Sequence, residues 1–176
     1  MRNLNNKLFG KFLRYPCSVK SHDSRKHGLF HHTFKLLKQI SNLNDVGNKT
    51  KDLCLVGAVF HDIGKIKSLH NYVEKSKNIY SYDFLIGHKQ NSIEIFDDLS
   101  SRINNFPSIY HRLIKNIIIW THNVDYDVPG TLPGKIISIL DNTDAAISSL
   151  IEKDKKISVG RFSKLPYQKN YYYKAI

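Results

Sequence analysis

The sequence places histidines and aspartates inside apolar segments that are far apart along the chain. His61 and Asp62 interrupt the otherwise apolar run GAVFHDIGKI, residues 57–66, which also contains Lys65. Imidazole and charged groups in such a run cost free energy unless other groups pair with them. The run is therefore either a buried polar network or the centre of a functional site.

Further residues of the same two types lie within or beside other apolar stretches, namely His32, His88, His122 and Asp141. Imidazole and carboxylate groups together are typical ligands of divalent transition metals such as Mn, Fe, Co, Ni or Zn. Each apolar stretch therefore offers a group that can turn inward toward a shared cation. The residue types favour metal-dependent chemistry.

Helical periodicity accounts for the apolar stretches themselves. The spacing of apolar residues predicts helices over about residues 24–43, 50–65, 84–103, 108–121 and 131–150. Ser108 and Thr131 are the predicted N-caps of the last two helices. The helix over 50–65 is apolar on nearly every side, which is typical of the central helix of a bundle. No strand pair or internal repeat is evident in the sequence, so the predicted class is all-α, with a bundle of five or more helices.

Helix geometry separates two neighbouring histidines in the first predicted helix. At about 100° per residue, His32 lies beside Leu36 and Leu43 at the edge of the apolar arc. His31 points away from that arc. His32 is therefore the predicted ligand, and His31 is predicted to lie at the surface.

These segments resemble the HD superfamily of metal-dependent phosphohydrolases. The signature of that family is a His, then a His-Asp doublet, then a distant Asp, on an all-helical bundle. The matching segments are GLFHHT (28–33), FHDIGK (60–65), LIGH (85–88), IIWTHN (118–123) and ILDNTDA (139–145). Their order is similar to that in the HD domain of bacterial 3′→5′ exoribonucleases, and the HD domains of conjugative relaxases look similar too.

The resemblance implies three parts of the chain. Residues 24–151 form the HD domain, preceded by a basic N-terminal arm over residues 1–23. A basic, Tyr-rich tail over residues 152–176 follows it. The exoribonucleases that look similar carry a separate oligonucleotide-binding module, which residues 1–23 are too short to supply.

The resemblance also implies a first metal site made by four residues, His32, His61, Asp62 and Asp141. Asp62 is the predicted catalytic residue among them, because it can bridge two ions. Either Asp62 or Asp141 can orient the attacking water. Adjacent helix positions point about 100° apart, so the doublet would approach an ion from two sides.

His88 and His122 match intermediate motifs of two-metal members of the superfamily. They are candidates for binding a second ion or for contacting substrate phosphate. The alternative for each is a hydrogen-bonded histidine near a helix end. Two-metal members usually carry a His-His pair where this chain has Thr121-His122, so one ion and two ions both stay open.

Lys65 and Asp144 are further candidates for substrate binding, and Lys65 is also a predicted catalytic residue. Lys65 lies about one turn after His61, where it could neutralise a phosphate oxygen in the transition state. The alternative is a lysine at a helix end, favoured by the helix dipole. Asp144 lies three residues after Asp141 on the same helix face, so it either supports a ligand, faces substrate or is simply solvated.

The charge of the chain bears on its partner. The formal net charge is +12 and the pI is about 9.6, which suits a polyanion such as single-stranded RNA or DNA. The alternative is a bias of the composition toward Lys, Asn, Ile and Tyr, which would give the same positive charge without any role in binding.

Three functions therefore stay open. The first is a metal-dependent phosphodiesterase acting on single-stranded nucleic acid or oligonucleotides. The second is a phosphohydrolase of nucleotides or cyclic dinucleotides, and the third is a non-catalytic HD binding module. The sequence leaves the oligomeric state open.

The remaining sequence features concern location. No apolar run is long enough to span a bilayer, and the first residues lack the apolar core of a secretory signal, so we expect a cytoplasmic protein without membrane contact. Two cysteines fit a reducing compartment. Cys54 is predicted to be a buried thiol, and Cys17 to lie in a polar, mobile segment.

Overall fold

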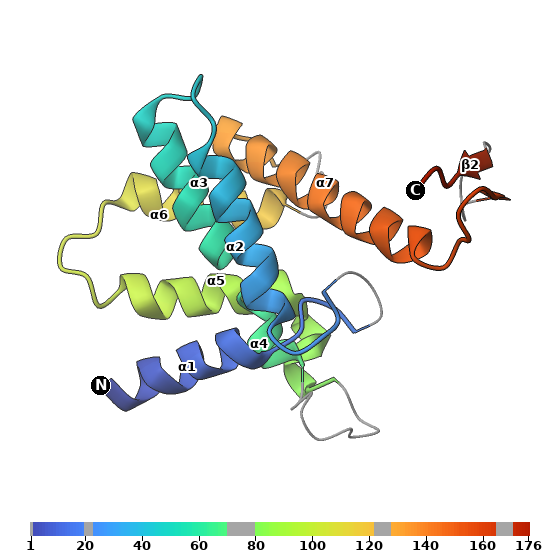
Figure 1. Ribbon diagram of the computed structural model, residues 1–176. Helices are drawn as coiled ribbons and strands as arrows, with labels where there is room; N and C mark the ends of the chain where they lie inside the picture. The colour runs from blue at the N-terminus through green and yellow to red at the C-terminus, as the bar shows by residue number, and fades with distance from the viewer. Residues whose placement is uncertain (1, 20–22, 70–79, 122–127, 165–170) are drawn as a thin grey trace.

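The computed structural model describes residues 2–19, 23–69, 80–121, 128–164 and 171–176 (Figure 1). Its helices are α1 (Arg2–Arg14), α2 (Gly28–Ser41), α3 (Asn48–Phe60), α4 (Lys65–Ser68), the 3-10 helix η2 (Tyr82–Ile86), α5 (Gly87–Ser100), α6 (Ser108–Trp120) and α7 (Leu132–Asp154). The predicted all-α class is confirmed. None of the described helices has the length and apolar character that crossing a membrane requires.

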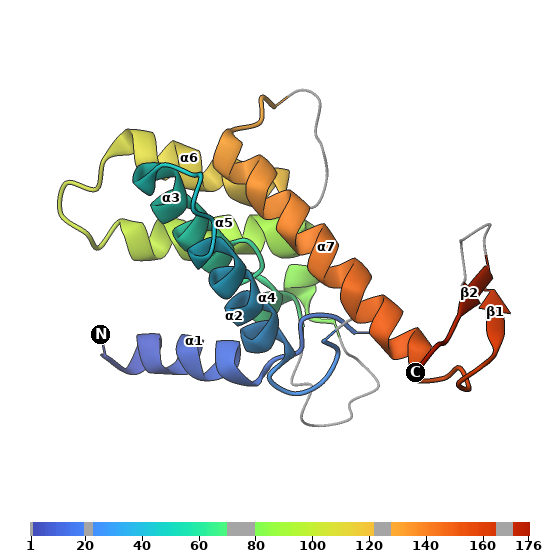
Figure 2. The same ribbon diagram turned by 45° about the horizontal axis from the view of Figure 1, so that its top comes forward.

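Helix α3 lies at the centre of the bundle, where it contacts α2, α5, α6 and α7 (Figures 1 and 2). The core that joins these helices contains fully buried side chains from four of them: Leu36, Ile40, Cys54, Ala58, Ile117 and Ile137. Burying a side chain the size of Leu or Ile contributes about 1.5–3 kcal/mol, so this cluster fixes how α2 and α7 sit against α3.

A second core cluster joins the N-terminal segment to the bundle. It contains Tyr15, Cys17, Leu29, Ile63, Ile66, Leu69 and Ile95. The prediction that Cys17 lies in a polar, mobile segment is wrong, because its side chain is completely buried in this cluster. The reason is tertiary: α1 packs on α2 and brings the residues that follow α1 into the core.

One helix boundary and one strand pair differ from the predictions in ways that bear on the architecture. The helix predicted over 50–65 ends at Phe60, and residues 61–64 form a turn before α4. A short antiparallel strand pair, β1 (Phe162–Lys164) with β2 (Tyr171–Tyr173), forms beyond α7, although no strand pair was evident in the sequence. Figure 2 shows this pair at the far end of α7, away from the other helices.

The starts of α6 and α7 show how capping works here. Thr131 caps α7 as predicted, since its hydroxyl accepts a hydrogen bond from the Gly134 backbone N–H at 3.3 Å. Ser108, by contrast, is the first residue of α6, and Pro107 holds the cap position without a side-chain bond. The fixed φ angle of Pro107 sets the direction of the backbone at the start of α6 instead.

Candidate metal centre

Four buried side chains from three parts of the bundle meet at one place. His32 lies in α2, His61 and Asp62 in the turn after α3, and Asp141 in α7. Their exposed fractions are 0%, 0%, 1% and 6% in that order. We call these four residues the His/Asp cluster.

The ligand atoms of the His/Asp cluster are close together. His32 Nε2 lies 3.3 Å from His61 Nε2 and 3.0 Å from Asp141 Oδ1. His61 Nε2 lies 3.9 Å from the same Asp141 oxygen. Asp62 Oδ2 is 3.4 Å from His61 Nε2 and 4.0 Å from His32 Nε2. Metal–ligand bonds of about 2.0–2.2 Å put neighbouring ligand atoms about 3.0–3.6 Å apart. The distances of 3.0, 3.3 and 3.4 Å lie in this range and those of 3.9 and 4.0 Å are longer, so the spacing is close to that of ligands that share one ion.

The hydrogen bonds of the two imidazoles also fit a metal. His61 Nδ1 donates to the Ala58 carbonyl oxygen at 2.8 Å, and His32 Nδ1 donates to Asp144 Oδ2 at 2.8 Å. With both Nδ1 protons placed there, each Nε2 turns toward the cluster as an electron-pair donor. A carboxylate on the far nitrogen, like Asp144 on His32, is the usual support of a metal-binding histidine.

Without a cation, the local charges favour a proton on His32. Burial lowers the pKa of His32, but the hydrogen bonds with Asp141 and Asp144 outweigh it and raise that pKa to about 9. The proton thus satisfies the carboxylates that a divalent ion would otherwise neutralise. A metal ion must displace this proton in order to bind His32.

Lys35 neutralises the carboxylate that supports His32. Its Nζ lies 2.7 Å from Asp144 Oδ1 and 2.9 Å from Asp23 Oδ2. Burial raises the pKa of Asp144, but the bonds with His32 and Lys35 more than offset this and leave it below its ordinary value. Asp144 therefore stays ionised and keeps its bond to His32.

The turn after α3 is set by contact with α5. A Cβ atom on Gly64 would lie 2.0 Å from the His88 carbonyl oxygen, so only glycine fits this close approach. The Gly64 N–H donates to Ser92 Oγ at 2.8 Å, and that hydroxyl donates to the His61 carbonyl oxygen at 3.3 Å. These contacts hold the His-Asp doublet in place. The sequence predicted the doublet within a helix, whereas the structure places it in the turn after α3.

Three further groups surround Asp62. Lys65 Nζ lies 2.5 Å from Asp62 Oδ2, and Cys17 Sγ lies 3.6 Å from the same oxygen. His88 Nε2, from the start of α5, lies 3.6 Å from Asp62 Oδ1. Burial lowers the pKa of Lys65, but the charge of Asp62 outweighs it and holds that pKa above its usual range. The lysine is a permanent cation beside this carboxylate.

The other predicted site residues fall into distinct places. His31 is exposed and lies 3.0 Å from Asp23 Oδ1, as the helix geometry predicted for a surface residue. Asp144 is 5% exposed and bonds His32 and Lys35, which favours ligand support over substrate contact. The predicted ligand His122 lies outside the described residues. Its neighbour Thr121 is buried, and its hydroxyl donates to the Ile117 carbonyl oxygen of its own helix at 2.8 Å.

Sequence reasoning missed Cys17, Asp23 and Lys35. Lys35 could have been found, because it follows His32 by three residues and shares its helix face. Cys17 and Asp23 lie before α2 and carry no periodic signal. Only the packing of α1 and the following segment brings them close to the His/Asp cluster.

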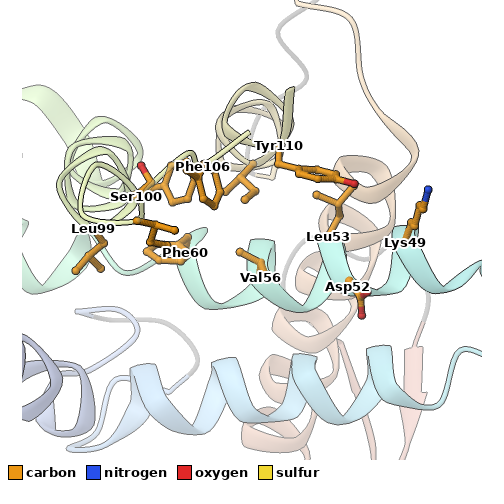
Figure 3. Close-up of a pocket in the computed structure, with 12 residues that line it drawn as sticks. Lys49, Asp52, Leu53, Val56, Phe60, Leu99, Ser100, Phe106 and Tyr110 are labelled. Carbon is orange, nitrogen blue, oxygen red and sulfur yellow. The ribbon is translucent and has the colours of Figure 1, made fainter. Parts of the chain in front are cut away.

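Two pockets of the described residues have no member of the His/Asp cluster in their walls. One of about 480 Å³ opens between α3, α5 and α6 and is mainly apolar, with Phe60, Phe106 and Tyr110 in its wall (Figure 3). Lys49 and Asp52 lie at one end (Figure 3). No member of the His/Asp cluster lines this pocket.

Comparison with known proteins identifies the family to which the chain is related. Residues 29–146 match the model of a family described as HD domain. The chain is 23% identical over 163 residues to 3'-5' exoribonuclease YhaM of Bacillus licheniformis, covering 89% of this chain and 51% of that protein. It is 22% identical over 167 residues to 3'-5' exoribonuclease YhaM of Bacillus velezensis, covering 92% of this chain and 52% of that protein.

The chain thus spans about half the length of these curated relatives. No solved structure matches it. The matched span contains all four residues of the His/Asp cluster, and the resemblance stated from the motifs is confirmed. The chain belongs to the HD domain family.

Proposed function

We propose that this chain is a metal-dependent phosphohydrolase that cleaves phosphodiester bonds in single-stranded nucleic acid or oligonucleotides. The observation that carries the proposal is the His/Asp cluster, in which Nε2 and carboxylate oxygens from α2, the turn after α3 and α7 lie 3.0–4.0 Å apart. The two exoribonuclease relatives and the net charge of +12 support nucleic acid as the substrate class.

Each residue of the His/Asp cluster has a role in this proposal. His32, His61, Asp62 and Asp141 hold a divalent cation, with Asp144 and the Ala58 carbonyl oxygen fixing the two imidazoles. A bound ion of this type activates a water molecule and polarises the phosphoryl oxygen. Asp62 is the residue that orients the attacking water.

Lys65 and His88 are the proposed contacts for the substrate. Lys65 Nζ lies 2.5 Å from Asp62 Oδ2, and His88 Nε2 lies 3.6 Å from Asp62 Oδ1. Both residues come from helices that follow the His-Asp doublet. Lys65 is 18% exposed and His88 is 31% exposed at the side chain, so each lies between the buried cluster and the surface. A cation at Lys65 is suited to stabilise negative charge that develops on a phosphate oxygen.

Purified protein, metal analysis and a substrate screen test the proposal. With Mn²⁺ added, we expect hydrolysis of short single-stranded RNA, and Asp62→Ala should reduce it by at least about 100-fold because it removes a ligand. The matched control is Asp98→Ala, since Asp98 is exposed and pairs only with Arg102 among the described contacts. Circular dichroism checks that both variants keep their helices.

The outcomes separate the candidate functions. Turnover of nucleotides or cyclic dinucleotides without turnover of RNA or DNA would replace the substrate class by small molecules. Absence of bound metal, together with no turnover when Mn²⁺ is added, would favour a binding module. Full activity of Asp62→Ala would show that the proposed site is not the catalytic one.

A further inference from the structure

Cys17 reaches the metal ligand Asp62 from outside the span that matches the HD domain. Its Sγ lies 3.6 Å from Asp62 Oδ2 and 3.6 Å from Lys65 Nζ, and its side chain is completely buried. The family match begins at residue 29, so this contact comes from a segment that precedes it. Cys17, His32 and Asp62 also form a group whose ligand atoms all lie within 4.8 Å of one another.

The backbone holds Cys17 firmly in this place. The Cys17 N–H donates to the Asp23 carbonyl oxygen at 2.9 Å, and the Leu29 N–H donates to the Tyr15 carbonyl oxygen at 3.0 Å. Gly28 closes the contact, because a Cβ there would lie 1.8 Å from the Asp23 oxygen and 3.0 Å from the Cys17 nitrogen. Backbone hydrogen bonds therefore hold the segment after α1 against the start of α2, with the Cys17 side chain buried beside Asp62.

We propose that Cys17 is a positioning residue for the metal site. Its S–H donates to Asp62 Oδ2, the oxygen that also accepts from Lys65, and so fixes the orientation of this carboxylate toward the cation. The inference rests on the proposed function only in taking the His/Asp cluster to bind a cation. It adds a residue of the N-terminal segment to the support of that site.

Cys54 provides a matched comparison within the same chain. It is also completely buried, but its Sγ lies 3.9 Å from the Pro133 carbonyl oxygen and packs in the core cluster of α2, α3, α6 and α7. Replacing either cysteine by alanine removes one buried sulfur atom. Only the replacement of Cys17 removes a hydrogen-bond donor from a proposed metal ligand.

The test is the affinity of the full chain for Mn²⁺, measured by calorimetry on metal-free protein. We expect Cys17→Ala to weaken Mn²⁺ binding about tenfold, in the range found for groups that support metal ligands. Cys17→Ser keeps a donor and should bind within about threefold of the wild type. Cys54→Ala should bind Mn²⁺ like the wild type, whatever stability it loses.

Two results would overturn the inference while leaving the proposed function intact. One is equal Mn²⁺ affinity in Cys17→Ala and Cys54→Ala. The other is a thiolate-to-cobalt charge-transfer band in the wild-type Co²⁺ complex that disappears in Cys17→Ala, since Cys17 would then bind the ion itself. Wild-type protein that binds no metal would overturn both the inference and the proposed function.

Discussion

Adjacent residues of the same type have opposite environments in α2. His32 is completely buried between Asp141 and Asp144, whereas His31 is exposed and faces Asp23. The 100° rotation between neighbours in a helix is enough to separate a proposed ligand from a surface group. The position of a histidine around the axis of α2, and not the residue type, therefore decides whether its side chain is buried or exposed.

This difference predicts unequal effects of two alanine substitutions. His32→Ala removes a proposed metal ligand and should reduce hydrolysis by at least about 100-fold, whereas His31→Ala should change it by less than about threefold. The rate of Mn²⁺-dependent hydrolysis measures both. Equal losses in the two variants would contradict the placement of His32 at the site.

At the scale of elements, the motif residues could be predicted from the sequence and the connections between elements could not. Periodicity and the order of His, His-Asp and Asp found His32, His61, Asp62 and Asp141. The end of α3 at Phe60 was missed because the apolar run continues through Ile66. The turn there depends on the contact of Gly64 with α5, which no local signal reveals.

The same contact predicts that Gly64→Ala is destabilising. The added methyl group would overlap the His88 carbonyl oxygen, so α4 and α5 must move apart, at a cost of about 1–3 kcal/mol. Gly47→Ala is the control, because a Cβ there meets nothing within 4 Å, and it should cost at most about 0.5 kcal/mol. Denaturant unfolding measures both, and similar stability of the two variants would count against the tight turn.

The loop before α2 is tied to α7 through Asp23, Lys35 and Asp144. Burial raises the pKa of Asp23, but its bonds with Lys35 and His31 outweigh burial and leave that pKa below the ordinary value. A lowered carboxyl pKa stabilises the fold above pH about 4 and loses this contribution as the pH falls through the lowered value.

Asp23→Asn should therefore be less stable than the wild type at pH 7, by about 1 kcal/mol, and the difference should shrink near pH 3. Urea unfolding of metal-free protein at the two pH values measures this. Asp45→Asn serves as the control, since Asp45 is exposed. A difference between Asp23→Asn and the wild type that stays constant from pH 7 to pH 3 would argue against the ion pair.

For the whole molecule, the His/Asp cluster is a junction of three parts of the bundle. It joins three parts of the chain: α2, α7 and the turn after α3. The packing of α3 against α2 and α7 keeps these parts in place relative to one another. A cation that binds the folded state alone stabilises that state by mass action, about 2.7 kcal/mol at 100 times its Kd.

Added Mn²⁺ should accordingly raise the Tm of the wild type by about 5–10 °C, and excess EDTA should reverse the rise. Asp141→Ala lacks the proposed ligand from α7 and should show no such rise. Differential scanning calorimetry with and without Mn²⁺ measures both proteins. A rise of the same size in Asp141→Ala would mean that Mn²⁺ binds elsewhere.

Asp141 comes from α7, the last long helix among the described residues, whereas His32, His61 and Asp62 come from the first half of the sequence. During synthesis on the ribosome, the early ligands emerge well before the final one. In the proposed function, a nascent chain could not bind its cation with all four proposed ligands until α7 has been made and has docked, so ion uptake would come at the end of folding and not at its beginning.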